Sequence, residues 1–164
     1  GSGNQGITTS VPIIVYCREK HLDEETLYRA LVFSNLCTIH EKTGIGRLSA
    51  FCGAVCAATA AGVTLTYLKG GTLEQIGNTI RNTFANISGI VCDGAKTTCA
   101  LKIHTSLQSA FLASKLALRG KTYDANTGIL KGSCESTIDA IGVLGKEGMK
   151  ETDKIILNIM LEKE

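Results

Sequence analysis

The sequence has 164 residues, with 17 basic and 15 acidic side chains and a formal net charge of +2. This near balance excludes the strongly basic surface with which proteins bind nucleic acid or anionic membranes. The length suits one domain with a hydrophobic core. Tryptophan is absent, aromatic residues make up 5% and there are 18 glycines. Small side chains let backbones approach, so we expect closely packed helices.

The apolar segments favour a globular protein over a secreted or membrane-spanning one. No window resembles a secretory signal peptide. The most apolar stretch, residues 49–68, is rich in Ala, Thr, Gly and Cys, which favours a buried helix over a membrane span. The seven cysteines lie in apolar helical patterns, so no disulfide framework is expected and a cytoplasmic location is predicted. The chain begins without Met, and we expect it to be a portion of a longer protein.

The first half of the sequence predicts a polar, glycine-rich segment followed by helices. Residues 1–10 are polar and glycine-rich, and Pro12 suits the first turn of an apolar segment that follows them. Asp23 is a predicted N-cap, and apolar residues at helical spacing continue to about His40. After a break, residues 47–68 are predicted as one long helix, stopped by two glycines.

The second half predicts further helices and no strand. Thr72 and Gln75 form a capping-box pattern. Helices are expected over residues 72–87, 95–119, 133–141 and 152–164. The predicted fold class is therefore all-α: a single domain over residues 1–164, built as a compact bundle of about six to seven helices with small-residue packing and Gly-rich loops.

The stretch CDGAKTTCAL, residues 92–101, places two cysteines around the start of a predicted helix. Free amide groups at a helix start favour a negative ligand and lower the pKa of a thiol. Cys92 lies just before that start, and the residues alone leave open whether it is a ligand or a buried small side chain. Cys99 lies inside the predicted helix, which favours a core position.

Other cysteines raise the same alternatives. Cys134 in GSCEST also lies at a predicted helix start, so it and Cys92 could converge on one metal or cluster, or be two unrelated buried thiols. Cys52 and Cys56 are four residues apart on one helical face. No adjacent His, Asp or Glu completes a metal site there, so structural packing is favoured.

Several polar residues are candidates for binding an anion. The stretch GSGNQGITTS could cradle a carboxylate or phosphate with its backbone amides, or be only a flexible end that includes a cloning remnant. Lys96, Lys102 and Arg47 could anchor an anionic substrate or simply be solvated. His40 and His104 are expected to pack or hydrogen-bond rather than to act as bases.

The blocks GSGNQGI, GRLSAFCGAVCAATAAG, IGNTIRNTFANISGIVCDGAKTTCALKI and GSCEST resemble the C-terminal half of the L-cysteine desulfidase or UPF0597 family. That family is related to the α chain of bacterial iron–sulfur L-serine dehydratases. The resemblance implies a 4Fe–4S cluster held by three cysteines, with one iron open as a Lewis acid toward the leaving group. It implies β-elimination from L-cysteine, giving pyruvate, ammonia and sulfide, or from L-serine, giving pyruvate and ammonia.

The resemblance also implies roles for individual residues. Cys92 and Cys134 match family ligand positions, whereas Cys99 does not appear to be a ligand. The substrate-binding residues implied are Ser2, Gly3, Asn4 and Gln5, to which the candidate anion anchor Lys96 is added. The third ligand and the base are expected in a missing N-terminal half, which would be a partner of this portion, and a homodimer is a further hypothesis.

Two functional classes follow. The first is an iron–sulfur lyase whose isolated portion is expected to be inactive. The second is a non-catalytic helical regulatory or scaffold domain with buried cysteines. A single-metal hydrolase is disfavoured because the sequence lacks a His, Asp and Glu cluster with suitable spacing.

Overall fold

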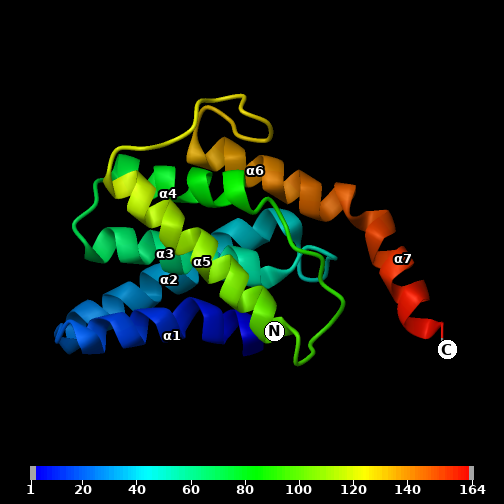
Figure 1. Ribbon diagram of the computed structural model, residues 1–164, viewed down its shortest axis with the longest axis horizontal. Helices are drawn as coiled ribbons and strands as arrows, with labels where there is room; N and C mark the ends of the chain where they lie inside the picture. Colours follow the sequence, from blue (N-terminus) through cyan, green and yellow to red (C-terminus); the bar gives the residue numbers. More distant parts are fainter. Residues whose placement is uncertain (1–2, 163–164) are drawn as a thin grey trace.

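The computed structural model describes residues 3–162, and within that range it contains seven α-helices (Figure 1). The helices are α1 (Gly3–Glu19), α2 (Glu24–Ile45), α3 (Gly53–Leu68), α4 (Leu73–Asn86), α5 (Cys99–Leu118), α6 (Cys134–Val143) and α7 (Lys150–Leu161). A π-helix, Leu144–Gly148, joins α6 to α7. The β-structure of the described residues is one isolated bridge between Phe51 and Val91. The all-α prediction is confirmed.

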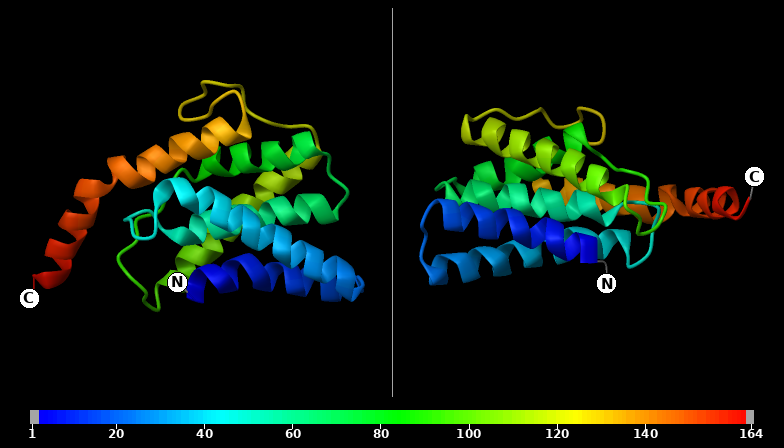
Figure 2. Two further views of the ribbon diagram at one scale, coloured as in Figure 1. Left: turned by 180° about the vertical axis from the view of Figure 1, so that it is seen from behind. Right: turned by 60° about the horizontal axis from the view of Figure 1, so that its bottom comes forward.

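Helix α3 lies at the centre of the bundle and packs against α1, α2, α4 and α5 (Figures 1 and 2). Every one of its residues from Gly53 to Thr66 is buried, and most are Ala, Gly, Thr or Cys. At Gly62 a Cβ would lie 2.7 Å from the carbonyl oxygen of Ala110 in α5, so α5 could not approach as closely. The small side chains therefore bring neighbouring helices close to α3, as the composition predicted.

Buried hydroxyl groups bind the helices to one another. The Thr9 hydroxyl in α1 lies 2.8 Å from the hydroxyls of both Ser34 and Thr38 in α2. In the same way Thr66 of α3 lies 2.8 Å from Thr79 of α4 and from Ser114 of α5. These pairs satisfy polar groups that would otherwise be costly to bury, and they fix how the helices pack.

Two helix starts differ from the sequence-based expectation. Helix α1 begins at Gly3, so residues 3–10 are helical and Pro12 lies inside the helix. Pro12 removes one backbone donor, but burial of Ile13 and Cys17 stabilises the helix around it. Helix α3 begins only at Gly53.

The reason for the late start of α3 is a long-range contact. The Cys52 amide donates to the Ile90 carbonyl at 2.8 Å, and the Cys92 amide donates to the Ala50 carbonyl at 2.6 Å. These two bonds hold residues 50–52 in an extended conformation beside 90–92. The expected helix over residues 47–52 is therefore replaced by a paired segment.

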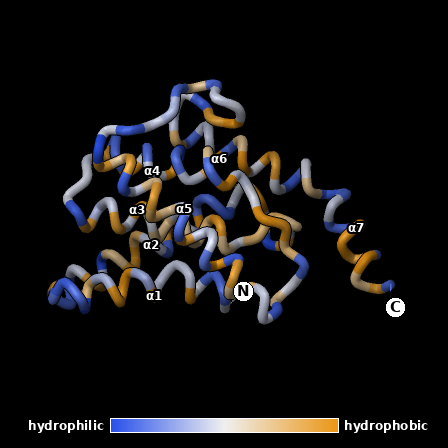
Figure 3. Tube along the Cα trace, viewed as in Figure 1, coloured by the Kyte–Doolittle hydropathy of each residue, from blue (hydrophilic) through white to orange (hydrophobic). Residues whose placement is uncertain are grey.

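Helix α7 projects from the bundle, and none of its residues is buried (Figures 1 and 3). It carries apolar side chains such as Ile155 and Ile159 that are more than half exposed. Its start at Lys150 and end at Leu161 are close to the expected helix over residues 152–164. In the part of the chain that the structure describes, no helix is long and apolar enough to cross a membrane.

Candidate metal centre and substrate cavity

A cavity of about 360 Å³ lies where the first residues of α1, α3 and α5 meet, and we call it the thiol cavity. Three cysteines from three separate segments line it: Cys52, Cys92 and Cys99. The other lining residues are Gly3, Asn4, Gln5, Lys42, Arg47, Leu48, Ser49, Phe51, Gly53, Ala54, Gly94, Ala95 and Ile103. In Figure 2 the chain start, the start of α5 and the loop before it lie together at one end of the bundle.

Local backbone structure places two of the thiols at helix starts and the third in a paired segment. Cys52 is the N-cap residue of α3, and Cys99 is the first residue of α5. Cys92 lies in the paired segment beside Ala50. The Cys99 sulfur lies 3.4 Å from the backbone nitrogen of Lys96, which donates to it, and 3.6 Å from the Gly94 carbonyl. Cys99 is buried, as expected, but it also faces the cavity.

Helices α3 and α5, which begin at this cavity, lack side-chain caps, whereas three helices that begin elsewhere have them. Asp23, Thr72 and Ser133 accept hydrogen bonds from the first turns of α2, α4 and α6. Neither Cys52 before α3 nor Thr98 before α5 provides such a bond. A helix N-terminus carries a partial positive charge that favours an anion, and in α5 the amides of residues 99–101 already donate to the carbonyls of residues 96–98. The thiol cavity therefore suits a negatively charged occupant.

The thiols influence one another electrostatically. Burial raises the pKa of the Cys52 thiol, and the neighbouring Cys92 and Cys99 add to that effect. The nearby Ala54 amide and the charge of Lys102 act in the opposite direction. Without a metal, burial and mutual repulsion thus favour the protonated thiol of Cys52. Metal ions bind thiolates, so a bound metal would offset that repulsion.

The predicted substrate residues of α1 lie at the same cavity. Gly3, Asn4 and Gln5 all line it, while Ser2 lies outside the described residues. The Gln5 side chain packs directly onto Gly53, where a Cβ would overlap its amide nitrogen. A glycine at the start of α3 therefore gives Gln5 room beside Cys52.

Two cations also reach the thiol cavity. Arg47 had been a candidate anion anchor from the sequence, whereas Lys42 had not. Lys42 lies in the last turn of α2, where a basic residue is common because it complements the helix dipole, so its sequence position gave no functional signal. Among the ion pairs of the described residues, none includes Lys42 or Arg47.

Lys96 does not line the cavity, and its role in substrate binding stays a prediction. Its Nζ donates to the Asp93 carbonyl and lies 4.0 Å from the Met160 sulfur of α7. The tight turn at Gly94, with φ of 92°, directs the Lys96 side chain back over its own loop.

The structure does not bring Cys134 to Cys92. Helix α6 packs against α2 and α4, and the Cys134 sulfur lies against Gly77, where a Cβ would be 3.4 Å away. Cys134 does not line the thiol cavity. Burial, followed by the charge of Glu135, raises the pKa of the Cys134 thiol. Glu135 in turn lies 2.7 Å from His40, which hydrogen-bonds as expected.

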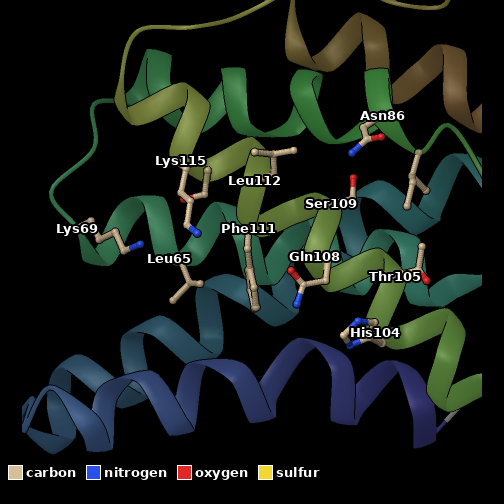
Figure 4. A pocket seen from close by; sticks show the side chains of 12 residues that line it. Leu65, Lys69, Asn86, His104, Thr105, Gln108, Ser109, Phe111, Leu112 and Lys115 are labelled. Carbon is tan, nitrogen blue, oxygen red and sulfur yellow. The ribbon is translucent and has the colours of Figure 1, made fainter.

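A larger cavity of about 850 Å³ runs along α5 and contains no cysteine (Figure 4). Its polar lining includes Lys69, His104, Gln108 and Lys115. No cysteine lines it, and the α5 residues that line it come from the middle of that helix rather than from its start. We therefore take the smaller thiol cavity as the candidate site.

The thiols of the cavity are not grouped as ligands of a single metal ion. Within residues 3–162, no three His, Cys, Asp or Glu side chains are close enough to hold one metal ion. In an iron–sulfur cluster each thiolate binds a different iron, so the thiols stand further apart than around one ion. Three thiols line this one cavity, beside the starts of α3 and α5.

Known proteins resemble this chain over nearly its whole length. The sequence profile of the serine dehydratase alpha chain matches residues 1–158. A UPF0597 protein of Treponema denticola is 51% identical over 162 residues, and one of Lachnoclostridium phytofermentans is 52% identical over 161. These matches cover 99% and 98% of this chain but only 38% and 39% of the relatives, so the chain spans about two fifths of their length. No solved structure matches. The chain belongs to the serine dehydratase alpha chain family.

Proposed function

We propose that this chain forms the cluster-binding and carboxylate-binding part of an iron–sulfur lyase that catalyses β-elimination from L-cysteine or L-serine. The observation that carries the proposal is the meeting of three thiols with the uncapped starts of α3 and α5 in one cavity. Family membership supports a related enzymatic role. The choice of substrate and cofactor belongs to the proposal.

Cys52, Cys92 and Cys99 would hold a 4Fe–4S cluster. All three are in this chain, so the third ligand need not come from another part of the protein. Cys134 is replaced in this assignment because it lies against Gly77 and outside the cavity. When bound, an iron without a protein ligand supplies a Lewis acid toward the leaving hydroxyl or thiol.

The residues of α1 and α2 would bind the substrate. Its carboxylate would accept hydrogen bonds from the Asn4 and Gln5 amides and pair with Arg47 or Lys42, which all line the cavity. Charge-assisted hydrogen bonds of this kind are strong and orient a planar carboxylate. With the carboxylate held in this way, the leaving group on Cβ would face the cysteines. The α-proton would face the side of the cavity that opens to solvent.

The reaction needs a base for the α-proton. Loss of that proton, with cleavage of the Cβ–O or Cβ–S bond, forms the double bond of 2-aminoacrylate, and water then releases ammonia and gives pyruvate. No Asp, Glu or His among the described residues lines the thiol cavity. We place the base in the portion of the relatives' length that this chain does not cover, and we expect the chain alone to be inactive.

The test is an anaerobic assay of pyruvate, with ammonia and sulfide, using L-serine and L-cysteine and the complete gene product. Arg47→Met should raise KM about 10- to 100-fold, because a hydrogen bond to a charged group is lost. The control is Lys115→Met, which removes a charge in the cavity along α5 and should leave KM unchanged. A complete protein that retains iron but forms no pyruvate from either substrate would reject the lyase and favour a scaffold domain.

A further inference from the structure

Lys102 makes two hydrogen bonds that bracket Cys92. It lies in the first turn of α5, and its Nζ donates to the Val91 carbonyl at 2.9 Å and to the Asp93 carboxylate. On its other side, the Cys92 amide donates to the Ala50 carbonyl at 2.6 Å. The segment that carries Cys92 is therefore held from α5 and from the residues preceding α3.

The charge of Lys102 acts on the thiols as well as on the loop. Its side chain is only 21% exposed, which limits screening by solvent. The pKa of Lys102 is raised mainly by the hydrogen bond to Asp93, and Cys52 and Cys92 also contribute. Lys102 in turn opposes the rise in the pKa of the Cys52 thiol. One ammonium group thus lies close enough to influence two of the three cysteines.

Lys96, in the loop before α5, is a useful comparison for Lys102. It donates to the Asp93 backbone carbonyl and lies 3.9 Å from the Asp93 carboxylate, and its side chain is 42% exposed. It is not among the charges that influence the Cys52 thiol. The two lysines therefore differ in where their charge lies, although both are within ten residues of Cys92.

We propose that Lys102 is the positioning residue of the thiol cavity, holding Cys92 in place and supplying a fixed positive charge beside the anionic centre. The holding role depends only on the contacts of the chain itself. The electrostatic role rests on the proposed function, since it requires a cluster in the cavity. Partners of metal ligands typically change metal affinity 10- to 100-fold when removed.

Three substitutions separate the two roles in the reconstituted chain. Lys102→Met removes both donor and charge, Lys102→Gln keeps a donor without the charge, and Lys102→Arg keeps both. We expect Lys102→Met to release iron to a chelator about 10- to 100-fold faster, and Lys102→Arg to restore retention. In electrode titrations, Lys102→Met and Lys102→Gln should shift the midpoint potential to more negative values, because positive charge favours the reduced cluster. Lys96→Met and Lys102→Arg should not shift it.

A second readout needs no metal. In the metal-free chain, Lys102→Met should speed hydrogen exchange of the Cys92 amide about tenfold, and Lys102→Arg should reverse this. Circular dichroism verifies that each variant is folded. A folded Lys102→Met with wild-type exchange and iron release would overturn the proposal. If the wild type binds no iron, the proposed function and the electrostatic role both fall, while the exchange rate still decides the holding role.

Discussion

Cys92 and Cys134 have similar sequence surroundings but very different structural ones. Each lies beside a glycine at the approach to a helix. Around Cys92, two further thiols and uncapped helix starts share one cavity. At Cys134, a capping box joins the Ser136 amide to the Ser133 hydroxyl and the Ser133 amide to the Ser136 hydroxyl. The partial positive charge of a helix start favours an anion that lies next to it.

The charges reinforce the difference between the two regions. Beside Cys92, the one adjacent carboxylate, Asp93, is paired with Lys102, whose hydrogen bond lowers the pKa of Asp93. Beside Cys134, Glu135 adds negative charge, and its partner His40 is more than half exposed. The thiolate form of Cys134 is thus disfavoured.

The largest expected effect separates the two cysteines directly. In the anaerobically reconstituted chain, Cys92→Ser should abolish the iron–sulfur absorption and electron paramagnetic resonance signals, because a ligand is lost. Cys134→Ser is the matched control and should retain them. Loss of the signals in Cys134→Ser, with retention in Cys92→Ser, would reverse the assignment.

A smaller effect concerns the α1 contact. Gly53→Ala would place a methyl group where the Gln5 amide lies, and the flexible Gln5 side chain would move away from the cavity. We expect KM of the complete protein to rise about tenfold while iron content is unchanged, since a hydrogen bond to the carboxylate is lost. Steady-state kinetics with both amino acids check this. An unchanged KM would remove Gln5 from the substrate site.

The buried side chain of Glu41 in α2 should lower the free energy of unfolding at pH 7 by about 1–3 kcal/mol. Its carboxylate is fully buried without a hydrogen-bond partner, and burial raises its pKa well above the ordinary 4.5. The folded chain therefore holds a proton that the unfolded chain releases. The associated stability is complete below pH 4.5 and declines as pH rises toward the folded-state pKa.

Glu41→Gln removes that ionisation, so the variant should gain stability relative to wild type as pH rises. Denaturant unfolding at pH 4.5 and at pH 7 measures the difference at the ordinary pKa and above it. A constant difference between wild type and variant at the two pH values would show that Glu41 does not ionise on unfolding.

The smallest expected effects compare helix caps. Ser133→Ala removes the cap of α6 and should lower the free energy of unfolding by about 1 kcal/mol. Thr98→Ala at the start of α5 removes no capping bond, so we expect a loss below about 0.5 kcal/mol. Neither change should alter iron content. A larger loss in Thr98→Ala would contradict the difference in capping.

Local signals made much of the fold predictable. Asp23 caps α2, and Thr72 with Gln75 forms the predicted capping box of α4, because both depend on neighbouring residues alone. The start of α3 was not predictable, since the pairing of residues 50–52 with 90–92 is long-range. In α5, Leu101 is 70% exposed, because the buried face is formed by Ser and Ala residues that pack closely on α3 and α4.

The candidate site was predictable only in part. Gly3, Asn4, Gln5 and Cys92 do lie at one cavity, as the sequence and the family resemblance indicated. Cys52 had seemed to lie inside a helix of small residues, and its place at a helix start depends on the long-range pairing. The local sequence around Cys134 also suits a ligand, and only the packing of α6 against α4 separates it from the cavity.

The most direct test is the iron and acid-labile sulfide content of this chain after anaerobic reconstitution, alone and as Cys52→Ser. Because all three proposed thiols are present, we expect about four iron and four sulfide per wild-type chain. Cys52→Ser should bind substantially less. No iron on the wild type, or full iron content in Cys52→Ser, would contradict a cluster held by Cys52, Cys92 and Cys99.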